Sequence, residues 1–268
     1  MHEPSDSEPE KGREGARTLT RERRRQILEA LGNDQRVLAN ELAARFGVSE
    51  DTIRRDLRDL AEEGLLRRVY GGAVPRTPSA PTYEGRRNES VEAKSAIATT
   101  AAGFLRDGQV VFFDAGTTAL AVATHLARDV RLTVVTHSLP VASALAEHPT
   151  VEVILLGGRL IKESLSMAGA ETIQGYRSVR ADVCVLGTAS VHPEIGLGVL
   201  DHTDAEVKRA MVSAAAEVMV VAAGEKLGTS APFLVGPLGL VDRLGTDGAA
   251  PGEVLRALAQ AGIEISRG

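Results

Sequence analysis

The stretch that decides the fold reads VSEDTIRRDLRDLAEEGLLRRVYGGA and occupies residues 48–73. After Ser49, a suitable helix N-cap, apolar side chains recur at helical spacing and form one stripe, made of Ile53, Leu57 and Leu60. A shorter apolar pattern from Leu38 to Phe46 predicts a preceding helix that ends at Gly47. Two short helices joined by such a tight turn indicate a helix-turn-helix, whose second helix can enter the major groove of DNA.

The residues around this motif complete a small predicted domain. An earlier helical pattern at residues 19–31 places four apolar side chains near one face, namely Leu19, Ile27, Leu28 and Leu31, and Gly32-Asn33 can end it. After the motif, LLRRVYGGAV alternates like a strand and contains Gly71-Gly72, which predicts a β-wing with a glycine turn. The sequence therefore predicts a winged helix-turn-helix domain at residues 19–75.

Two segments lack the pattern of a folded domain. Residues 1–18 are polar and charged, with no apolar run for secretion or for a membrane span, and they predict a disordered tail. Residues 76–90 contain Pro78 and Pro81 and few apolar side chains, and they predict an extended linker.

The composition is that of an ordinary globular protein. A chain of 268 residues, 43% apolar and 25% charged, suits a small domain plus a larger one. Cys184 is the single cysteine, which excludes an internal disulfide and favours a reducing compartment, so we expect a cytoplasmic protein. The net charge is −5, and only five of the 31 basic residues are lysine, a bias that we attribute to genome composition.

The rest of the chain, from residue 91 to residue 268, alternates helical patterns with short apolar runs. These runs lie at Val110–Phe113, Leu132–Val135, Val151–Leu156, Val183–Leu186, Val218–Ala222 and Leu240–Leu244. Continuous apolar strands separated by helices are typical of a parallel sheet covered on both faces. Such a sheet binds ligands in the loops beyond the carboxyl ends of its strands.

The exposed side of the predicted recognition helix carries arginines that suit DNA. Arg54 and Arg55 can bind guanine or clamp a phosphate. Residues 20–75, however, hold eleven arginines against ten acidic residues. Charge alone therefore fits equally well a solvated helix in which Arg55 pairs with Asp51 and Asp59.

One loop of the larger domain has the features of a phosphate cradle. Asp114-Ala115-Gly116-Thr117-Thr118 follows an apolar run and opens a helix, so backbone N–H groups and hydroxyls can meet an anion there. The alternative is a tight turn in which Thr117 only caps the helix. Further polar loops follow other strands, at Thr136-His137-Ser138, Gly157-Gly158-Arg159 and Gly187-Thr188-Ala189-Ser190.

Several charged or reactive side chains have more than one interpretation. Lys208 follows Asp204 by one helical turn, so it can form a surface ion pair or reach an anionic ligand. His192, His202 and Asp201 lack the spacing of metal ligands and are expected to be solvated loop residues, so we predict neither a metal nor a cofactor. Cys184 lies inside an apolar run and is expected in the core.

These patterns resemble the DeoR family of bacterial transcription regulators over about residues 19–266. In the first domain the resemblance rests on Val48-Ser49, Thr52-Ile53-Arg54-Arg55-Asp56-Leu57, Leu60, Gly64, Leu66, Arg68 and Gly71-Gly72-Ala73. In the second it rests on Lys94 with Ile97, residues 114–118 and 135–138, Leu156-Gly157-Gly158, Gly169, and Lys208 with Met211.

The resemblance implies an α/β protein in which a winged helix-turn-helix precedes an effector-sensing and oligomerisation domain at residues 91–268. That domain is expected to be a parallel sheet similar to ribose-5-phosphate isomerase. The implied function is repression of carbohydrate-metabolism genes by a homodimer or homotetramer bound to operator DNA and modulated by a phosphorylated sugar. The competing hypothesis is an isomerase-like enzyme with Asp114 or Asp204 as proton shuttle and Lys208 as electrostatic support.

The site residues follow from the patterns and the resemblance together, and they include no catalytic residue. The expected DNA contacts are Ser49, Asp51, Thr52, Arg54, Arg55, Arg58, Arg67 and Arg68. The expected effector contacts are Asp114, Gly116, Thr117, Thr118, Thr136, His137, Ser138, Gly157, Gly158 and Lys208.

Three positions depart from the usual family pattern. Tyr70 stands in the wing where the family usually has histidine, and His137 stands where it usually has asparagine. Near residues 222–226 the family commonly has an aspartate and a Ser-Lys pair, whereas this chain has alanines followed by Glu225-Lys226.

Overall fold

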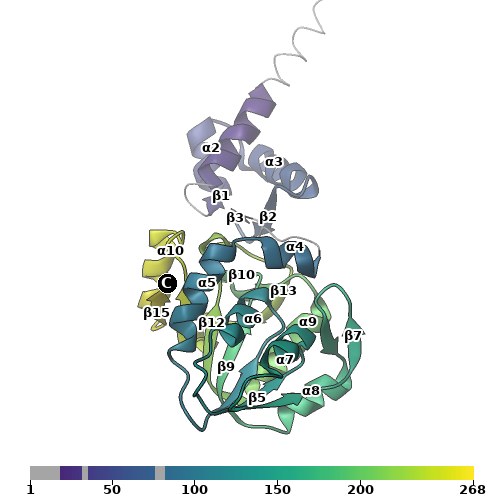
Figure 1. The fold of residues 1–268 in the computed structure, drawn as a ribbon. Coiled ribbons are helices and arrows are strands. Elements are labelled where there is room, and N and C mark those ends of the chain that lie inside the picture. Colours follow the sequence, from purple (N-terminus) through teal and green to yellow (C-terminus); the bar gives the residue numbers. More distant parts are fainter. Residues whose placement is uncertain (1–18, 32–35, 76–81) are drawn as a thin grey trace, which may run out of the picture. The chain divides into compact units, whose positions relative to one another are not determined.

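A computed structural model describes residues 19–31, 36–75 and 82–268 of the protein (Figure 1). The chain divides into two compact units, Met1–Arg76 and Thr77–Gly268. The predicted tail at residues 1–18, the helix stop at Gly32-Asn33 and residues 76–81 of the predicted linker lie outside the described residues.

The described part of the first unit contains helices and a short antiparallel sheet. The helices are residues 19–31, α2 (Ala39–Phe46) and α3 (Glu50–Glu62), and the strands are β1 (Val37–Leu38), β2 (Leu66–Val69) and β3 (Gly72–Pro75). The strand order is β1-β3-β2. Gly47 has a φ of 64°, a left-handed conformation that ends α2 and turns the chain toward α3.

The core of the first unit follows the predicted apolar stripes, with two exceptions. Ile27, Ile53 and Leu57 are buried together as expected. Leu38 does not open the second helix, because it pairs with Gly72 in the sheet and α2 begins one residue later. Leu19 is 70% exposed, since it lies two helical turns before Ile27 and beyond the edge of this core.

The second unit is built on a seven-stranded parallel sheet. Its strand order is β15-β14-β12-β9-β4-β5-β6. The strands are β4 (Val110–Phe113), β5 (Leu132–Thr136), β6 (Val151–Leu155), β9 (Ala181–Gly187), β12 (Ala215–Val221), β14 (Arg243–Thr246) and β15 (Glu264–Arg267). Each neighbouring pair in this sheet is parallel.

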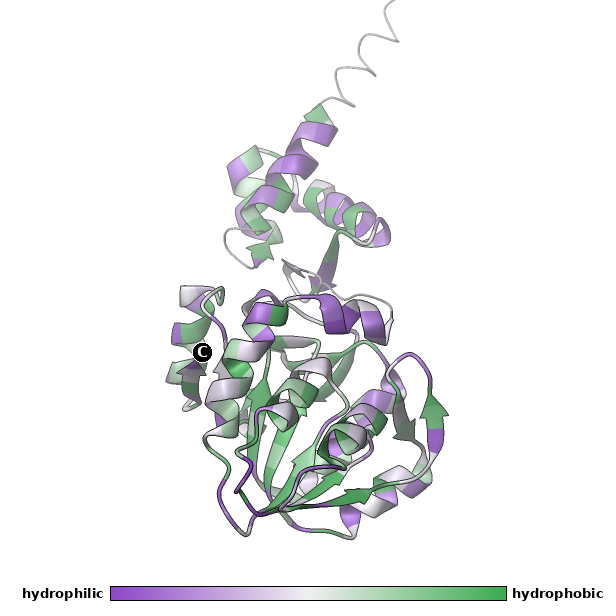
Figure 2. Cartoon of the chain, in the orientation of Figure 1, coloured by the Kyte–Doolittle hydropathy of each residue, from purple (hydrophilic) through white to green (hydrophobic). Residues whose placement is uncertain are grey.

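Helices cover both faces of this sheet, and two hydrophobic clusters fill the space between (Figures 1 and 2). The helices are α4 (Tyr83–Asn88), α5 (Val91–Ala102), α6 (Thr117–Thr124), α7 (Leu139–Leu145), α8 (Ala170–Arg177), α9 (His202–Ser213) and α10 (Gly252–Gln260), with short 3₁₀ turns at Gly224–Lys226 and Leu238–Leu240. Val111 and Phe113 of β4 pack with α5, α6 and α7, while Phe112 packs with α8 and α9 on the other face. The predicted doubly covered parallel sheet is confirmed.

Two smaller sheets flank the large one, and the apolar runs did not indicate them. One is antiparallel, with β10 (Ser190–His192), β11 (Gly196–Val199) and β13 (Phe233–Gly236) in that order. The other is a hairpin of β7 (Arg159–Ile161) and β8 (Ser166–Ala168). Their strands are only three or four residues long, so they lack a long apolar run.

Three predicted segments differ in the structure. Residues 83–88, placed in an extended linker, form α4, because Thr82 caps it by accepting a hydrogen bond from Gly85 N and Tyr83 is buried. The run Leu240–Leu244 does not form one strand, since β14 begins at Arg243. β6 is an edge strand, and its Ile154 and Leu155 are exposed rather than covered.

Candidate nucleic-acid interface and effector site

The exposed face of α3 carries most of the predicted DNA contacts. The Ser49 hydroxyl accepts a hydrogen bond from Thr52 N at 3.2 Å and lies 2.9 Å from the Thr52 hydroxyl, so it caps the helix. Asp51, Arg54, Arg55 and Arg58 are exposed, opposite the buried stripe of Ile53, Leu57 and Leu60. The helix therefore presents one polar face beginning at its first turn, which is the part of a recognition helix that reaches base edges.

The ion pairs of α3 differ from the predicted ones and leave arginines available. Arg54 pairs with Glu50 at 2.8 Å, whereas the expected pairs of Arg55 with Asp51 and Asp59 are absent from the described part of the chain. Arg55 and Arg58 form no ion pair with a described residue. Their charges remain open to an outside anion.

Asp56 turns its charge inward and braces the unit. It is 2% exposed, and its two carboxylate oxygens accept from Arg23 Nε at 2.6 Å and from Arg24 Nε at 3.1 Å. Arg24 also pairs with Asp59. Two of the acidic residues that balance the charge count, Asp56 and Asp59, thus join the first helix to α3.

The wing is the hairpin of β2 and β3. Gly71 has a φ of 78° at the turn, a conformation that favours glycine. Arg68 and Tyr70 are exposed, while Arg67 is half-buried. Of the two predicted wing arginines, Arg68 is thus the more accessible.

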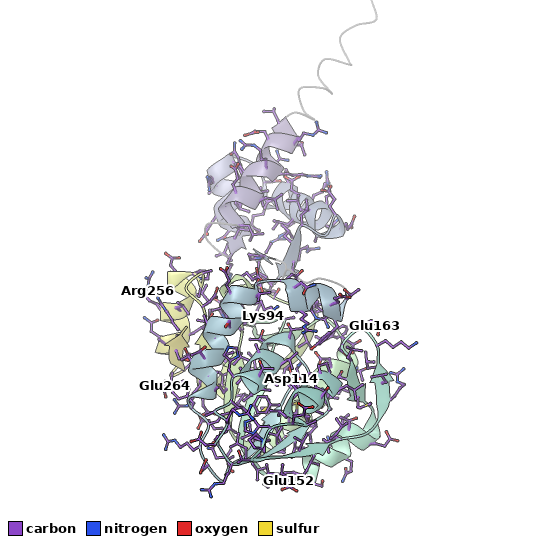
Figure 3. All side chains as sticks on the ribbon, in the orientation of Figure 1. Lys94, Asp114, Glu152, Glu163, Arg256 and Glu264 are labelled. Carbon is purple, nitrogen blue, oxygen red and sulfur yellow. The ribbon has the colours of Figure 1, made fainter. Side chains whose placement is uncertain are left out.

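In the second unit, the structure brings together side chains from the end of β4 and from α9. Asp114, labelled in Figure 3, is fully buried. Its Oδ2 accepts from Lys208 Nζ at 2.5 Å and from Gly187 N at 3.0 Å. Lys208 also lies 3.3 Å from Asp204 Oδ1. Of the two interpretations of Lys208, a surface pair is wrong, because the side chain is 4% exposed and bridges two carboxylates.

The charges of this triad stabilise one another. Burial disfavours the ionised form of Asp114, but the charge of Lys208 outweighs it and the pKa of Asp114 lies below its usual value. Burial likewise opposes the charge of Lys208, yet the two carboxylates raise its pKa. Burial raises the pKa of Asp204 to about 6 against the attraction of Lys208, and the charge of Asp114 adds to the rise.

Glycines make room for this triad. A Cβ at Gly187 would stand 2.8 Å from Asp114 Oδ2, and one at Gly116 would stand 3.5 Å from the same atom. The other oxygen, Asp114 Oδ1, is buried without a hydrogen-bond partner among the described residues. The predicted loops after β4 and β9 therefore converge, and they leave one buried acceptor unsatisfied.

Most hydroxyls predicted to bind the effector have structural roles. Thr136 Oγ1 donates to Phe113 O at 2.8 Å and accepts from Ser138 N, and Ser138 caps α7. Thr118 is 3% exposed inside α6. Gly116 and Thr117 remain partly exposed at the start of that helix, so they are the accessible part of the predicted cradle.

His137 is directed into the core. Its Nδ1 lies 2.7 Å from Tyr176 Oη, and both side chains are buried. Burial lowers the pKa of His137 to about 4 against the attraction of Asp114, so the ring is neutral at physiological pH.

Gly157 and Gly158 are not brought to the triad. They follow β6, which β5 separates from β4. Thr172 Oγ1 donates to Gly157 O at 2.7 Å, and a Cβ at Gly158 would meet the same hydroxyl. These glycines allow close packing of the loop on α8.

The structure adds cations that the list of expected contacts omitted. These cations are Lys94 and Lys226. Besides burial, the positive charges of Lys94 and Lys208 both lower the pKa of Lys226, so the three side chains lie near one another. Three of only five lysines in the chain thus gather at one end of the sheet. This scarcity was the available signal, because a lysine kept in an arginine-rich chain marks a place where a compact ammonium is required.

Other predictions concern metals, the cysteine and membranes. No group of potential metal ligands occurs among the described residues. His192 is a buried residue of β10, so its expected place in a solvated loop is wrong, and Asp201 caps α9.

Cys184 is buried in the core as expected, and burial raises its thiol pKa. In the described ranges no helix is long and apolar enough to cross a membrane.

Comparison with known proteins identifies the family. The DeoR-like helix-turn-helix domain matches residues 23–78, and the DeoR C-terminal sensor domain matches residues 89–248. The fold and the matches define a DNA-binding regulator with a sensor domain. The chain belongs to the DeoR family of transcription regulators, which confirms the predicted class and favours a regulator over the isomerase-like enzyme.

Several curated relatives align along most of the chain. The HTH-type transcriptional regulator GlpR of Haloferax volcanii is 35% identical over 252 residues, 93% of this chain and 98% of the relative. The glycerol-3-phosphate regulon repressor of Escherichia coli is 32% identical and covers 89% and 95%. The HTH-type transcriptional repressor GlcR of Bacillus subtilis is 34% identical and covers 82% and 86%.

Comparison with solved structures finds similarity at low identity and low TM-score. The full-length sorbitol operon regulator SorC from Klebsiella pneumoniae is 14% identical with a TM-score of 0.41, covering 88% of this chain and 99% of that one. Ribose 5-phosphate isomerase A from Methanocaldococcus jannaschii is 14% identical with a TM-score of 0.38, covering 52% and 55%.

Proposed function

We propose that the protein is a repressor of carbohydrate-metabolism genes that binds operator DNA through its first unit. Residues 19–75 serve as the DNA-binding domain, with α3 in the major groove and the wing on the backbone. The observation that carries this proposal is the exposed face of α3, on which Arg55 and Arg58 have no ionic partner in the described chain. Binding to an operator would bring the protein to the bacterial nucleoid.

The second unit, from residue 91 onward, senses a phosphorylated sugar or polyol and joins the copies of the chain. Gly116 and Thr117 offer backbone and hydroxyl donors at a helix N-terminus, and lysines add positive charge. Asp114 Oδ1 is an unsatisfied buried acceptor that suits a ligand hydroxyl. The names of relatives that refer to glycerol 3-phosphate support a small phosphorylated ligand.

A dimer or tetramer is the expected assembly. One helix-turn-helix contacts few bases, so specific affinity requires two copies that read repeated half-sites. The effector must favour one quaternary arrangement over another, because only differential affinity shifts a population. Analytical ultracentrifugation with and without operator would measure the assembly.

The proposal is tested by first selecting an operator from genomic fragments and then measuring its retardation. Arg54→Ala with Arg55→Ala should weaken specific binding by about a hundredfold or more, because two base or phosphate contacts are lost. Circular dichroism should stay unchanged, since both side chains are exposed. Arg25→Ala, on the exposed side of the first helix, is the matched control. Specific binding that survives in the double variant would refute the interface.

The sensing part is tested with the same operator complex. Glycerol 3-phosphate, ribose 5-phosphate and glucose 6-phosphate should be compared with the unphosphorylated compounds for release of the operator. Thr117→Ala should leave operator binding intact and reduce its sensitivity to the active compound. Release by the unphosphorylated compounds alone would show that the effector is not a phosphate.

A further inference from the structure

Lys94 and Lys226 carry charges that meet no carboxylate directly among the described residues. Lys94 is 7% exposed, and its Nζ donates only to the carbonyl oxygens of Arg86 and Glu89. Lys226 Nζ donates to Thr188 O at 3.1 Å. Neither lysine forms an ion pair with a described residue.

This arrangement is costly without a ligand. Burial lowers the pKa of Lys94, and the pKa of Lys226 falls to about 8 through burial and the charge of Lys94. Glu225 lies near both and partly offsets them, but its carboxylate is directed to the hydroxyl of Ser90 at 3.2 Å. A buried cation that has only neutral carbonyl partners is stabilised less than one that meets an anion.

The carbonyl oxygens that occupy Lys94 belong to the end of α4. Carbonyls in the last turn of a helix need donors from outside it. Arg86 O accepts from Lys94 and also from Thr117 Oγ1 at 3.4 Å. Thr117 is the first residue of α6, and the first backbone N–H groups of a helix have no partner within the helix. The end of α4 therefore takes hydrogen bonds that an anion at α6 would accept.

We propose that the phosphoryl group of the effector binds Lys94, Lys226 and Thr117 and displaces the carbonyl oxygens at the end of α4 from Lys94 and Thr117. This inference rests on the proposed function and adds a mode of regulation to its site. Three phosphoryl oxygens supply the acceptors that Arg86 O and Glu89 O now provide, and their charge neutralises the two ammonium groups. Phosphate and the docked end of α4 compete for the same donors.

The displacement has a direct route to the DNA-binding unit along the chain. α4 is the first helix described in the second unit, and Thr82 immediately precedes it. Residues 76–81 connect Thr82 to β3, the last strand of the first unit. The displacement does not touch the hydrogen bond that Arg86 Nη2 donates to Glu163 O at 2.8 Å. The helix on which the ligand acts is therefore the described helix of the second unit that lies nearest in the chain to the DNA-binding unit.

The competing account is that Lys94 only caps α4. Lysine commonly bonds the last carbonyls of a helix, and that role needs no ligand. It predicts that phosphate leaves α4 unchanged or, if it binds nearby, protects it. The two accounts therefore differ in the sign of one measurable change.

Hydrogen–deuterium exchange of the full chain, with inorganic phosphate as the probe and chloride at equal ionic strength as the control, measures that change. The amides of Arg86 and Glu89, which bond Thr82 O and Gly85 O, should exchange about tenfold faster with phosphate, as expected for the loss of charge-assisted bonds that hold the helix end. Amides in α9 should not change. Unchanged or slower exchange in α4 would overturn the proposal.

Variants separate binding from folding. Lys226→Met leaves the bonds to α4 intact and should raise the phosphate concentration needed for the response about tenfold. Lys162→Met, at an exposed lysine between β7 and β8, is the matched control and should respond like the unaltered chain. Lys94→Met should make α4 exchange fast even without phosphate. A normal response from Lys226→Met would overturn the proposal even if Lys94→Met failed to fold.

Failure of this inference is distinct from failure of the proposed function. If a phosphorylated sugar releases the operator while hydrogen exchange in α4 stays the same, the protein senses the effector in another way. In that case only the proposed displacement of α4 is wrong. If no phosphorylated sugar affects the operator, the sensing function is wrong, whatever phosphate does to α4.

Discussion

The basic side chains proposed to bind anions in the two units lie in opposite environments. In the first unit Arg55, Arg58 and Arg68 stand exposed on α3 and the wing. In the second, Lys94 and Lys208 are buried at the end of the parallel sheet. This contrast agrees with the size of the two expected anions. DNA can bind solvated charges spread over a wide surface, whereas a small phosphorylated ligand needs a few charges that are shielded from water.

The contrast also separates two uses of acidic residues. In the first unit the buried Asp56 accepts hydrogen bonds from two arginines, Arg23 and Arg24. In the second, Asp114 and Asp204 share one lysine and carry a net negative charge around it. Removing single charges from each unit tests how far this distinction holds.

The largest effect is expected for Lys208→Met. The variant leaves Asp114 fully buried without its cation, which should lower the free energy of unfolding of the second unit by about 3–5 kcal/mol. Scanning calorimetry would show an earlier transition for that unit. Adding Asp114→Asn should recover much of the loss, because the orphaned charge is then removed. Equal stability of the single and double variants would contradict a strong buried pair.

A pH effect of nearly this size is expected from His137. Its pKa is about 4 in the folded protein and 6.5 when unfolded, so the unfolded chain binds more protons between these values. Stability should therefore fall by up to about 3 kcal/mol as the pH drops from 6.5 toward 4. Asp204, with a raised pKa of about 6, acts in the opposite direction over much of this range.

The variant His137→Asn isolates the histidine from Asp204. It should flatten the acid side of the stability curve, measured by urea unfolding at several pH values, while the contribution of Asp204 remains. If both proteins lose stability equally on acidification, another group controls the transition.

A smaller loss is expected for Asp56→Ala in the first unit. Arg23 and Arg24 lose a buried acceptor but can turn toward water, so the cost should be about 2 kcal/mol. Asp59→Ala, at a carboxylate that is 36% exposed, should cost less than about 1 kcal/mol. Denaturation followed by amide exchange in α3 would compare the two. Similar costs would show that burial does not distinguish these acids.

The smallest effect is expected in the salt dependence of operator binding. Arg68→Ala should reduce the slope of log affinity against log salt by about 1, because one phosphate contact is lost from the wing. Arg25, which already pairs with Glu22 and Glu29, should not change the slope when replaced by alanine. An unchanged slope in Arg68→Ala would place the wing away from the backbone.

The parts that the sequence predicted well are those governed by local periodicity. The stripe of Ile53, Leu57 and Leu60 fixes which face of α3 is buried, and the apolar runs place β4, β5 and β9. The loop at residues 114–118 was assigned to the effector site from the same logic, since strand ends of a parallel sheet converge.

The rest depended on contacts between distant residues. The triad joins Asp114 to a lysine 94 positions away, and no spacing rule relates them. His137 follows a strand like its neighbours, yet the partner that draws it inward is Tyr176 on α8. α4 was missed because a single helical turn capped by Thr82 lies in a segment whose composition favours a linker.

The burial of Cys184 has a practical and a cellular consequence. Its thiol lies in the core between Phe112 and the helices on that face, and burial keeps the nucleophilic thiolate scarce. We therefore expect Cys184 to react slowly with oxidants and alkylating reagents. Oxidation of this thiol should then not alter the response of the regulator to its effector. A cysteine introduced on the surface, for example Glu84→Cys on α4, would be the reactive thiol of the chain and could carry a spectroscopic label to follow the helix directly.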